Sequence, residues 1–380
     1  MTLSVCMIVR NESETLDRCL VHARPFVDEI VIVDTGSTDG TQEIAKRYAD
    51  VFDEIEWPGS FAEARNYSMD LVTSDYMIIL DGDEYLPDPE GWALIRRTLE
   101  SGGVASLQLT VANVLRSDQL IGADRIIQDR VFRNHPLIRY NGKVHNQLES
   151  GLGRYLQQVG GTRSALPVEI VHTGYALSTD QMKRKYSPRI ELLEAEYYNA
   201  DSERYRAYYG YQLALAMFIL ERYETAHEIF GQLNYKVLSP DNGFYTHVLA
   251  AQIALRLADA ERALIHCNEM LNLSRREPVA YYTTGLALIL AGKPADGMLM
   301  MLGALDVADE FAGSIRFVLN HDVLIEKIAD LYTRMGMASQ ARKLRDTLLT
   351  SGGSVSSDEM RALLQQLKYQ IVVAEGAEAT

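Results

Sequence analysis

Cysteine is scarce in this sequence. Its 380 residues include only Cys6, Cys19 and Cys267. An odd, sparse set without close metal-ligand spacing indicates a reducing compartment, so we expect a cytoplasmic protein. Cys6 falls in an apolar run and Cys267 in a helical pattern, which favours packing rather than chemistry for both.

Long apolar runs and excess positive charge are also missing. No run reaches the ~18 apolar residues of a membrane-spanning helix, and residues 1–10 read as a strand rather than a signal peptide. The 37 Lys and Arg residues are outnumbered by 52 Asp and Glu, which gives a net charge of -15. That balance argues against a large nucleic-acid footprint or an anionic membrane surface.

Apolar runs alternate with helical patterns over the first 80 residues. Each run is short and almost wholly apolar, as in strands covered on both faces. This alternation predicts a parallel α/β sheet. The predicted strands are Leu3–Val9, Glu29–Val33, Val51–Glu56 and Tyr76–Leu80.

The last of these strands is followed by the sequence Asp-Gly-Asp. Asp81 and Asp83 therefore stand at its carboxyl end, and Gly82 permits a tight turn between them. Ligands of open α/β sheets bind just outside that end. Two close carboxylates favour a hard divalent cation, which can hold a diphosphate. The alternative is an ordinary strand-to-loop turn.

A second polar loop, 34–41, follows the second predicted strand. It lacks the Gly-Lys-Ser/Thr of a P-loop and the Gly-x-Gly-x-x-Gly of dinucleotide folds. Asp34 could still contact a ribose or base edge, with Gly36 admitting a ligand to the backbone; otherwise this is a capped βα turn. Arg65, early in the next helical pattern, could meet a phosphate or a neighbouring carboxylate.

Four motifs together resemble the family 2 glycosyltransferases of GT-A fold. The resemblance covers roughly residues 1–175. It depends on the order and spacing of Cys6–Glu12, Asp28–Gly40, Ala64–Asn66 and Leu80–Glu84.

The resemblance implies a metal-dependent, inverting transferase that uses a nucleotide sugar, with a UDP-hexose as the expected donor. Asp81 and Asp83 would hold Mn²⁺ or Mg²⁺ on the diphosphate, and Asp34 would bind the base or ribose. The residues implied around the donor nucleotide are Val9, Asn11, Asp34, Gly36, Arg65, Asp81 and Gly82.

The third metal ligand and the catalytic base are less closely defined. In GT-A enzymes a histidine after the last strand often completes the metal site, and His172 fits that place by order, with His145 as its competitor. Either could instead be a structural histidine. The candidates for the base are Asp129, His145 and Glu84, of which Asp129 is preferred because it precedes an Arg-Val-Phe-Arg block resembling one in the family. Asn146 stands where that block usually has Glu.

A basic segment, 181–189, follows the predicted sheet. Its cations could close over a diphosphate as a lid. It could equally be a solvated basic turn that leads into a helix.

From about residue 191 the pattern becomes helical and repeats. Four small residues at matching places, Ala226, Ala263, Gly297 and Ala341, are 37, 34 and 44 positions apart by subtraction. Tetratricopeptide repeats have a period of about 34 residues. The pattern predicts tetratricopeptide-like hairpins, although the Trp-Leu-Gly start is missing and divergent helical hairpins are the alternative.

The expected fold class is therefore an α/β GT-A domain followed by an all-α repeat domain. The expected boundaries are a catalytic domain at 1–178, a helical linker at 179–204, repeats at 205–350, and a C-terminal helix and tail at 351–380. A repeat stack can hold a polypeptide or form a homodimer interface.

The function expected from the resemblance is sugar transfer to a peptide or protein side chain. It is similar to that of transferases that join a family 2 domain to such repeats, among them the bacteriocin S-glycosyltransferases. A lipid-linked or lipopolysaccharide acceptor is one alternative. A catalytically inactive interaction scaffold is another.

Overall fold

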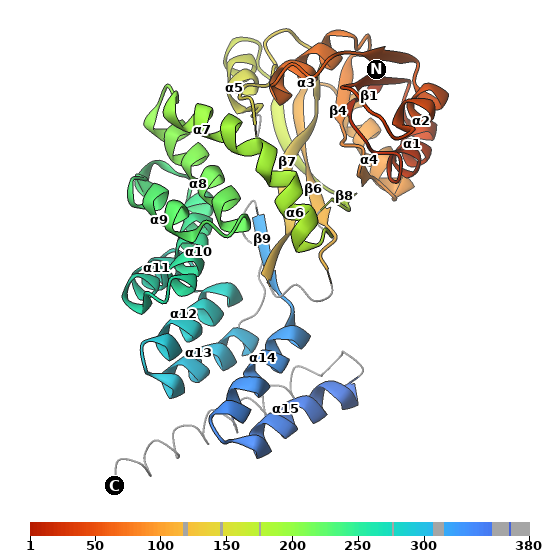
Figure 1. Cartoon of the computed structure of the whole chain (residues 1–380). Helices are drawn as coiled ribbons and strands as arrows, with labels where there is room; N and C mark the ends of the chain where they lie inside the picture. Colours follow the sequence, from red (N-terminus) through yellow and green to blue (C-terminus); the bar gives the residue numbers. More distant parts are fainter. Residues whose placement is uncertain are drawn as a thin grey trace. The chain divides into compact units, whose positions relative to one another are not determined.

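The structure is a computed structural model of the chain, in which residues 1–116, 121–144, 147–174, 176–275, 277–306, 315–351 and 365 are described. The chain forms two compact units. The first contains residues 1–115, 124–178 and 191–196, and the second contains 116–123, 179–190 and 197–380. Each is treated by itself below, with element labels as in Figure 1.

The first unit is the α/β part of the chain. Its elements are β1 (Leu3–Val9), α1 (Leu16–Ala23), η1 (Arg24–Phe26), β2 (Glu29–Asp34), α2 (Thr41–Tyr48), β3 (Val51–Glu54), α3 (Phe61–Asp70), β4 (Tyr76–Ile79), β5 (Glu84–Tyr85), α4 (Pro89–Glu100), β6 (Val104–Asn113), β7 (Ile121–Arg133), α5 (Glu149–Gln158) and β8 (Thr162–His172).

The strands form a mixed sheet in the order β3-β2-β1-β4-β7-β6-β8-β5. β3, β2, β1 and β4 pair in parallel with one another, which confirms the parallel sheet predicted for the first 80 residues. β7 then runs antiparallel to both β4 and β6. β8 is parallel to β6 and antiparallel to β5. Because β1, β2 and β4 are parallel neighbours, their carboxyl ends meet at one edge of the sheet.

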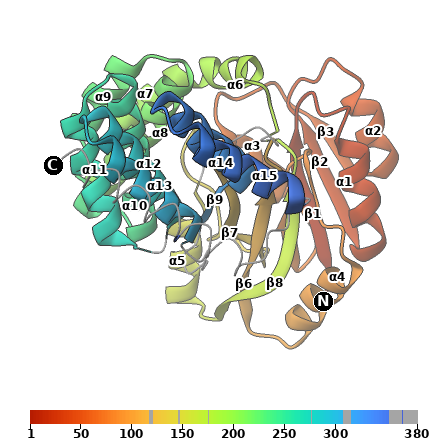
Figure 2. The same ribbon diagram turned by 90° about the horizontal axis from the view of Figure 1, so that it is seen from below.

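The strands are apolar because both faces of this sheet are covered. On one face Met7 packs with residues of α1, α2 and α4, among them the fully buried Trp92. On the other face the adjacent residue Cys6 packs with residues of α3 and α5, such as Met69. This alternation follows from the two-residue period of a strand. In Figures 1 and 2, α1 and α2 lie together beside β1–β3.

The cysteines are buried and free, in agreement with a packing role. Burial raises the pKa of the Cys6 thiol to about 12 and that of Cys267 to about 11, so both stay uncharged at neutral pH.

The second unit consists mainly of helices. Its elements are α6 (Thr179–Tyr186), η2 (Ser187–Arg189), α8 (Glu203–Ile219), α9 (Tyr223–Gly231), η3 (Tyr235–Val237), α10 (Pro240–Arg256), α11 (Ala260–Leu273), α12 (Pro278–Leu290), α13 (Pro294–Asp306), β9 (Ile315–Leu319), α14 (His321–Arg334) and α15 (Ala338–Ser351), while α7 (Ile190–Tyr198) contributes residues to both units. The predicted C-terminal helix and tail lie outside the described residues, apart from 351 and 365.

Four helical hairpins repeat along the described part of this unit, as predicted. In each, the residue two positions after the first helix has left-handed backbone: Glu221 (φ 61°), Ala258 (φ 56°), Gly292 (φ 78°) and Gly336 (φ 78°). By subtraction these residues are 37, 34 and 44 positions apart, the same intervals as the small residues seen in the sequence. Figure 1 shows the hairpins α8–α9, α10–α11, α12–α13 and α14–α15 following one another.

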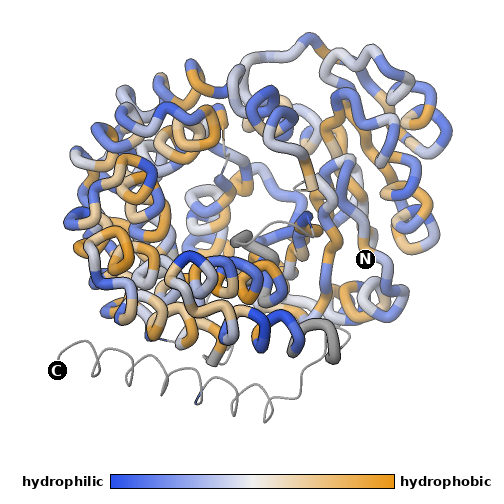
Figure 3. The backbone as a smooth tube through the Cα atoms, turned by 60° about the horizontal axis from the view of Figure 1, so that its bottom comes forward, coloured by the Kyte–Doolittle hydropathy of each residue, from blue (hydrophilic) through white to orange (hydrophobic). Residues whose placement is uncertain are grey.

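The small residues lie where paired helices touch. Ala226 and Ala263 are fully buried. A Cβ added to Gly297 would lie 2.5 Å from the carbonyl oxygen of Gly285, and one added to Gly285 would lie 2.6 Å from the carbonyl oxygen of Gly297. The backbones of α12 and α13 therefore meet where any side chain would clash. Figure 3 shows the hydrophobic segments on these paired helices and on the strands of the first unit. Within the described part of the chain, no helix is both long and apolar enough to cross a membrane.

Candidate active site

The predicted donor-site residues of the first unit gather at the carboxyl edge of its parallel strands. Val9, the last residue of β1, pairs with Asp34, the last residue of β2. Asp81 comes two residues after β4, which lies on the other side of β1. The structure therefore brings Val9, Asn11, Asp34 and Asp81 to the same edge of the sheet.

The Asp34 carboxylate is buried, and among the described residues only one of its oxygens accepts hydrogen bonds. Oδ1 accepts hydrogen bonds from the backbone N–H groups of Gly36 (2.9 Å) and Ser37 (2.8 Å) and from Gln42 Nε2 (3.2 Å). Oδ2 is buried and has no hydrogen-bond partner among the described residues. Since a buried acceptor without a donor is costly, Oδ2 fits a hydrogen-bond donor on a ligand.

Asn11 and Gly36 shape the loop around that carboxylate. Asn11 has left-handed backbone (φ 55°), and its Oδ1 accepts a hydrogen bond from the backbone N–H of Thr38 at 2.8 Å. Gly36 has φ 100°, a conformation that strains other residues, and a Cβ there would face open space. The glycine is therefore needed for the backbone turn and leaves room beside it.

Asp81 forms an ion pair with Arg65, whose Nη2 lies 2.5 Å from Asp81 Oδ1. The Arg65 side chain is 12% exposed and that of Asp81 38%. Burial works against the charge of Asp81, but Arg65 and then Arg130 outweigh it and hold the pKa of Asp81 well below its usual range. Arg65 Nη1 is buried without a hydrogen-bond partner in the described chain, and its guanidinium lies 5.7 Å from the centre of the Tyr140 ring.

A second ion pair, between Arg130 and Glu84, holds the turn that contains Asp81. Arg130 Nη2 donates to Glu84 Oε1 at 2.6 Å and Nη1 donates to Oε2 at 3.0 Å. Glu84 Oε2 also accepts a hydrogen bond from the backbone N–H of Asp81 at 2.9 Å. Burial raises the pKa of Glu84, helped by Asp81 and opposed by Arg130. Both oxygens of this candidate base are thus engaged in holding the turn.

Asp83 lies beside His172, the last residue of β8, with 3.3 Å between Oδ2 and Nε2. The other ring nitrogen, Nδ1, lies 2.7 Å from Asn113 Oδ1. Burial opposes a charge on His172, but the Asp83 hydrogen bond and the surrounding carboxylates raise its pKa. A Cβ on Gly174 would lie 2.1 Å from Asp83 Oδ2, so the chain leaves no room for a side chain where these two groups meet.

The chemistry of this group fits a divalent cation. Asp83 and His172 supply adjacent oxygen and nitrogen donors, which suit Mn²⁺. The second ring nitrogen of a metal-bound histidine usually donates to an oxygen, and Asn113 Oδ1 lies beside His172 Nδ1. Asp81 points to Arg65 instead. Among the residues that the structure describes, no three His, Cys, Asp or Glu side chains converge closely enough to hold a metal as they stand. His145, the competing ligand and base candidate, lies outside the described residues, as does Asn146.

Asp129 is placed apart from this group. Its Oδ2 lies 2.5 Å from Arg163 Nη2, and its Oδ1 accepts hydrogen bonds from Arg163 Nε (3.0 Å) and Ser106 Oγ (2.6 Å). The register of β6 and β7 shifts here, between Leu107 and Gln108, so Arg130, which bonds to Glu84, is the extra residue of a bulge beside Asp129. The structure does not bring Asp129 together with Asp81 and Asp83.

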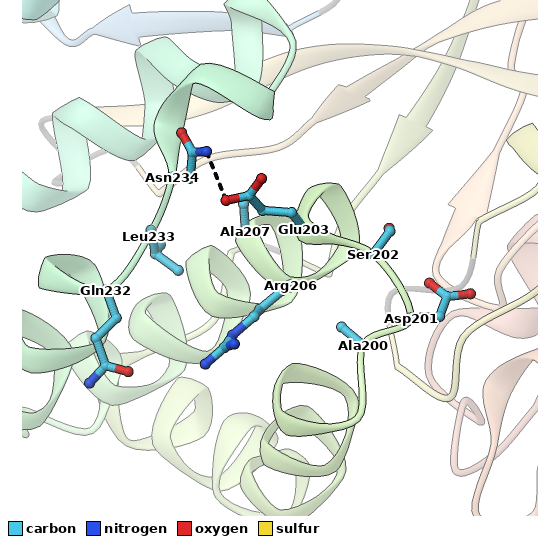
Figure 4. A pocket seen from close by; sticks show the side chains of 9 residues that line it. All are labelled: Ala200, Asp201, Ser202, Glu203, Arg206, Ala207, Gln232, Leu233 and Asn234. Atoms are coloured by element: carbon cyan, nitrogen blue, oxygen red, sulfur yellow. Dashed lines mark hydrogen bonds between the residues drawn. The ribbon is translucent and has the colours of Figure 1, made fainter.

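The second unit contains the basic segment 181–189 in α6 and η2, where Lys183 forms an ion pair with Glu221 at 3.0 Å. The same unit has a surface pocket of about 520 Å³ beside the first turn of α8. Figure 4 shows Arg206 reaching into it, and Glu203 accepting a hydrogen bond from Asn234 at 2.8 Å. The lining residues are Ala200, Asp201, Ser202, Glu203, Arg206, Ala207, Gln232, Leu233 and Asn234.

The sequence did not point to four residues of the site: Asn113, Arg130, Tyr140 and Gly174. Arg130 stands inside the Arg-Val-Phe-Arg block, but its partner Glu84 is 46 positions away. Asn113 is 59 positions from His172. Only the register of the strands brings the two members of each pair together. The available signal in the sequence was glycine, because a side chain at Gly82 or Gly174 would clash with a neighbouring residue.

Comparisons with known proteins match part of the chain to a known family. Residues 4–117 match the family model described as glycosyl transferase family 2. The first unit of the chain therefore contains a family 2 glycosyltransferase domain, as the resemblance implied.

Three curated relatives are similar to part of this chain. A TPR repeat-containing protein of Synechococcus elongatus is 34% identical over 175 residues, which are 46% of this chain and 42% of the relative. The SPbeta prophage-derived glycosyltransferase SunS of Bacillus subtilis is 28% identical over 203 residues, 51% of this chain and 44% of the relative. The lipopolysaccharide core biosynthesis glycosyltransferase LpsC of Rhizobium meliloti is 28% identical over 193 residues, 49% of this chain and 68% of the relative. The chain thus matches less than half the length of the first two.

Proposed function

We propose that this protein is a metal-dependent, inverting glycosyltransferase that moves a hexose from a nucleotide sugar, UDP-hexose in the first instance, to a peptide or protein side chain. One observation carries the proposal. A family 2 domain gathers the half-satisfied Asp34 carboxylate, the ionised Asp81 and the Asp83–His172 pair at one edge of its sheet.

The donor nucleotide would be held by groups that the chain leaves incompletely bonded. Asp34 Oδ2 would accept a hydrogen bond from the base or ribose, next to Val9, Asn11 and Gly36. The buried Arg65 Nη1 would donate to a phosphate oxygen. Asp81, Asp83 and His172 would hold Mn²⁺ or Mg²⁺, which when bound supplies positive charge to the departing diphosphate.

Asp129 stays the proposed base for the acceptor. Its carboxylate now forms an ion pair with Arg163, and the proposal requires the acceptor to replace Arg163 as its partner. Inversion needs only one such base and attack from the face opposite the leaving group.

A polypeptide acceptor is favoured by the repeats of the second unit. Stacked helical hairpins form extended surfaces that suit a polypeptide, and one relative is named for its TPR repeats. LpsC gives a specific reason for a second candidate, a lipopolysaccharide acceptor, because that name refers to lipopolysaccharide core biosynthesis.

The test has two steps. Nucleotide sugars are first screened for Mn²⁺-dependent hydrolysis by the wild-type protein and by Asp81→Ala and Asp83→Ala, with Glu43→Ala on the exposed side of α2 as the matched control. Hydrolysis that is lost in the first two variants and kept in the control supports the donor site. Equal, metal-independent hydrolysis in all four would leave an inactive scaffold as the better description.

The second step identifies the acceptor. Peptides, proteins and a lipid extract from the same source are incubated with the active donor and analysed by mass spectrometry. A hexose-sized mass increase on a polypeptide supports the proposal. An increase found only in the lipid extract would replace it with the lipopolysaccharide candidate.

A further inference from the structure

Asn113 and His172 lie side by side at the ends of two paired strands. They are register partners in the parallel pair β6–β8, and the backbone N–H of Val114 donates to the carbonyl oxygen of His172 at 2.8 Å. Asn113 is 7% exposed. The backbone pairing of β6 and β8 therefore fixes both residues of the 2.7 Å contact between Asn113 Oδ1 and His172 Nδ1.

This contact decides which ring nitrogen carries the proton. An amide oxygen only accepts hydrogen bonds, so Nδ1 of His172 must be the donor. In the neutral ring Nε2 then has a lone pair, and it is Nε2 that lies 3.3 Å from Asp83 Oδ2. Without Asn113 the carboxylate of Asp83 would draw the single proton to Nε2, where it would block a metal ion.

We propose that Asn113 is a positioning residue of the metal site: it fixes the Nδ1–H tautomer of His172 and so keeps the Nε2 lone pair directed at Asp83 for a divalent cation. This inference rests on the proposed function, which gives the site its cation. Gly174 complements Asn113, because a side chain there would collide with both Asp83 and His172. The ring is thus oriented by Asn113 Oδ1 at Nδ1 and lies with Nε2 beside Asp83 Oδ2, where Gly174 adds no side chain.

The test compares Asn113→Leu, which removes the acceptor at similar size, with Asn113→Asp, which keeps an oxygen there. Thr110→Val, on the same strand, is the matched control. The first measurement is the ¹⁵N chemical shift of the His172 ring nitrogens in metal-free protein above the ring pKa, which reports the tautomer. The second is the Mn²⁺ affinity without donor, followed by the EPR signal of free Mn²⁺.

Wild type, Asn113→Asp and Thr110→Val should show the Nδ1–H tautomer. Asn113→Leu should move toward Nε2–H and lose roughly 10- to 100-fold in Mn²⁺ affinity, the usual effect of removing such a partner. An unchanged tautomer and affinity in Asn113→Leu overturns the inference. So does an Nε2–H tautomer in the wild type, a result that does not depend on whether the leucine variant folds.

The two proposals fail in different ways. If the wild-type protein binds no Mn²⁺, the metal part of the proposed function is lost, and the ring shifts still decide whether Asn113 sets the tautomer. If Mn²⁺ binds tightly and Asn113→Leu binds it equally well, the function stands and the role of Asn113 is rejected.

Discussion

At the scale of single residues, the carboxylates of the site differ in how far their oxygens are already paired with other groups of the chain. Glu84 has both oxygens engaged by Arg130 and the Asp81 turn. Asp81 is held ionised by Arg65. Asp34 keeps one buried oxygen without a partner in the described chain. These differences follow from local contacts, and they separate groups that hold the fold from groups offered to a ligand.

Asp34→Asn tests the carboxylate whose Oδ2 has no hydrogen-bond partner among the described residues. In one orientation the amide would place its NH₂ group where the nucleotide needs a hydrogen-bond acceptor. In the other it would lose the hydrogen bonds from the backbone N–H groups of Gly36 and Ser37. We expect a loss of about 1–3 kcal/mol, or roughly ten- to a hundredfold, in the affinity for UDP measured by calorimetry.

The matched control is Gln42→Leu, which removes one hydrogen bond to Oδ1 and leaves Oδ2 untouched. Equal affinities for Asp34→Asn and wild type, in proteins with unchanged melting temperatures, would exclude a direct contact between Oδ2 and the nucleotide.

Asp129→Asn and Arg163→Gln separate a base from a structural ion pair. If Asp129 accepts a proton from the acceptor, Asp129→Asn should lower kcat by roughly 10²- to 10⁴-fold. Arg163→Gln, which removes the same ion pair, should change kcat less than about tenfold, because the carboxylate remains. Initial rates at saturating donor measure both. Similar losses in the two variants would assign Asp129 to structure alone.

Part of the site was predictable at this scale and part was not. Asp34, Asp81 and Asp83 stand in short motifs at or just after strand ends, and Arg65 stands early in the helix α3, so the chain order predicts that they lie near one another. Asn113 reaches His172 only through the β6–β8 register, which shifts between Gln108 and Thr110. A sequence does not display such a shift, since one displaced residue exchanges the two faces of a strand.

At the scale of elements, each helical hairpin has one residue with left-handed backbone between its two helices. The first helix of each hairpin is followed, two positions on, by a left-handed residue, which is glycine at 292 and 336 but Glu221 and Ala258 in the first two hairpins. The repeat interval was visible in the sequence because small residues recur at the helix contacts. The left-handed positions were not, because two of them lack the glycine that signals them.

Ala258→Gly should therefore stabilise the second unit. Glycine adopts φ 56° without the steric cost that alanine meets, and it gives back part of this gain through the freer unfolded chain. We expect a net gain of about 0.5–1 kcal/mol in the free energy of unfolding, measured by urea denaturation.

Gly292→Ala, at the corresponding place one hairpin later, is the reverse change and should destabilise by a similar amount. A loss of stability in Ala258→Gly would mean that the φ at 258 is not left-handed in solution.

At the scale of the whole molecule, acid should weaken the second unit through its histidines. His247 Nδ1 and His266 Nδ1 lie 3.1 Å apart, and the Tyr235 ring packs 4.9 Å from that of His247. Burial, followed by His247 and His227, lowers the pKa of His266 from its ordinary 6.5 to about 4. Burial also lowers the pKa of His247.

The sign of the pH effect follows from these shifts. Below about pH 6.5 the unfolded chain takes up protons that the folded chain excludes until about pH 4. Stability contributed by the neutral ring is therefore complete above pH 6.5 and is lost as the pH falls toward 4. Since His266 is partly exposed, we expect a loss of about 1 kcal/mol.

Denaturation midpoints across this pH range check the expectation. His266→Gln should show a flatter pH dependence than the wild type. His22→Gln, in the first unit, should keep the wild-type slope. Parallel curves for all three proteins would contradict a role for the His247–His266 pair.

The contact between Gly285 and Gly297 also bears on the order of assembly. The two residues are 12 positions apart, so their backbones meet after closure of a short loop, which costs little chain entropy. Repeat arrays can nucleate in any unit and grow outward from it. We therefore expect the α12–α13 hairpin, with local contacts and backbones too close for a side chain at Gly285 or Gly297, to be a nucleus for the second unit, to which the neighbouring hairpins can add.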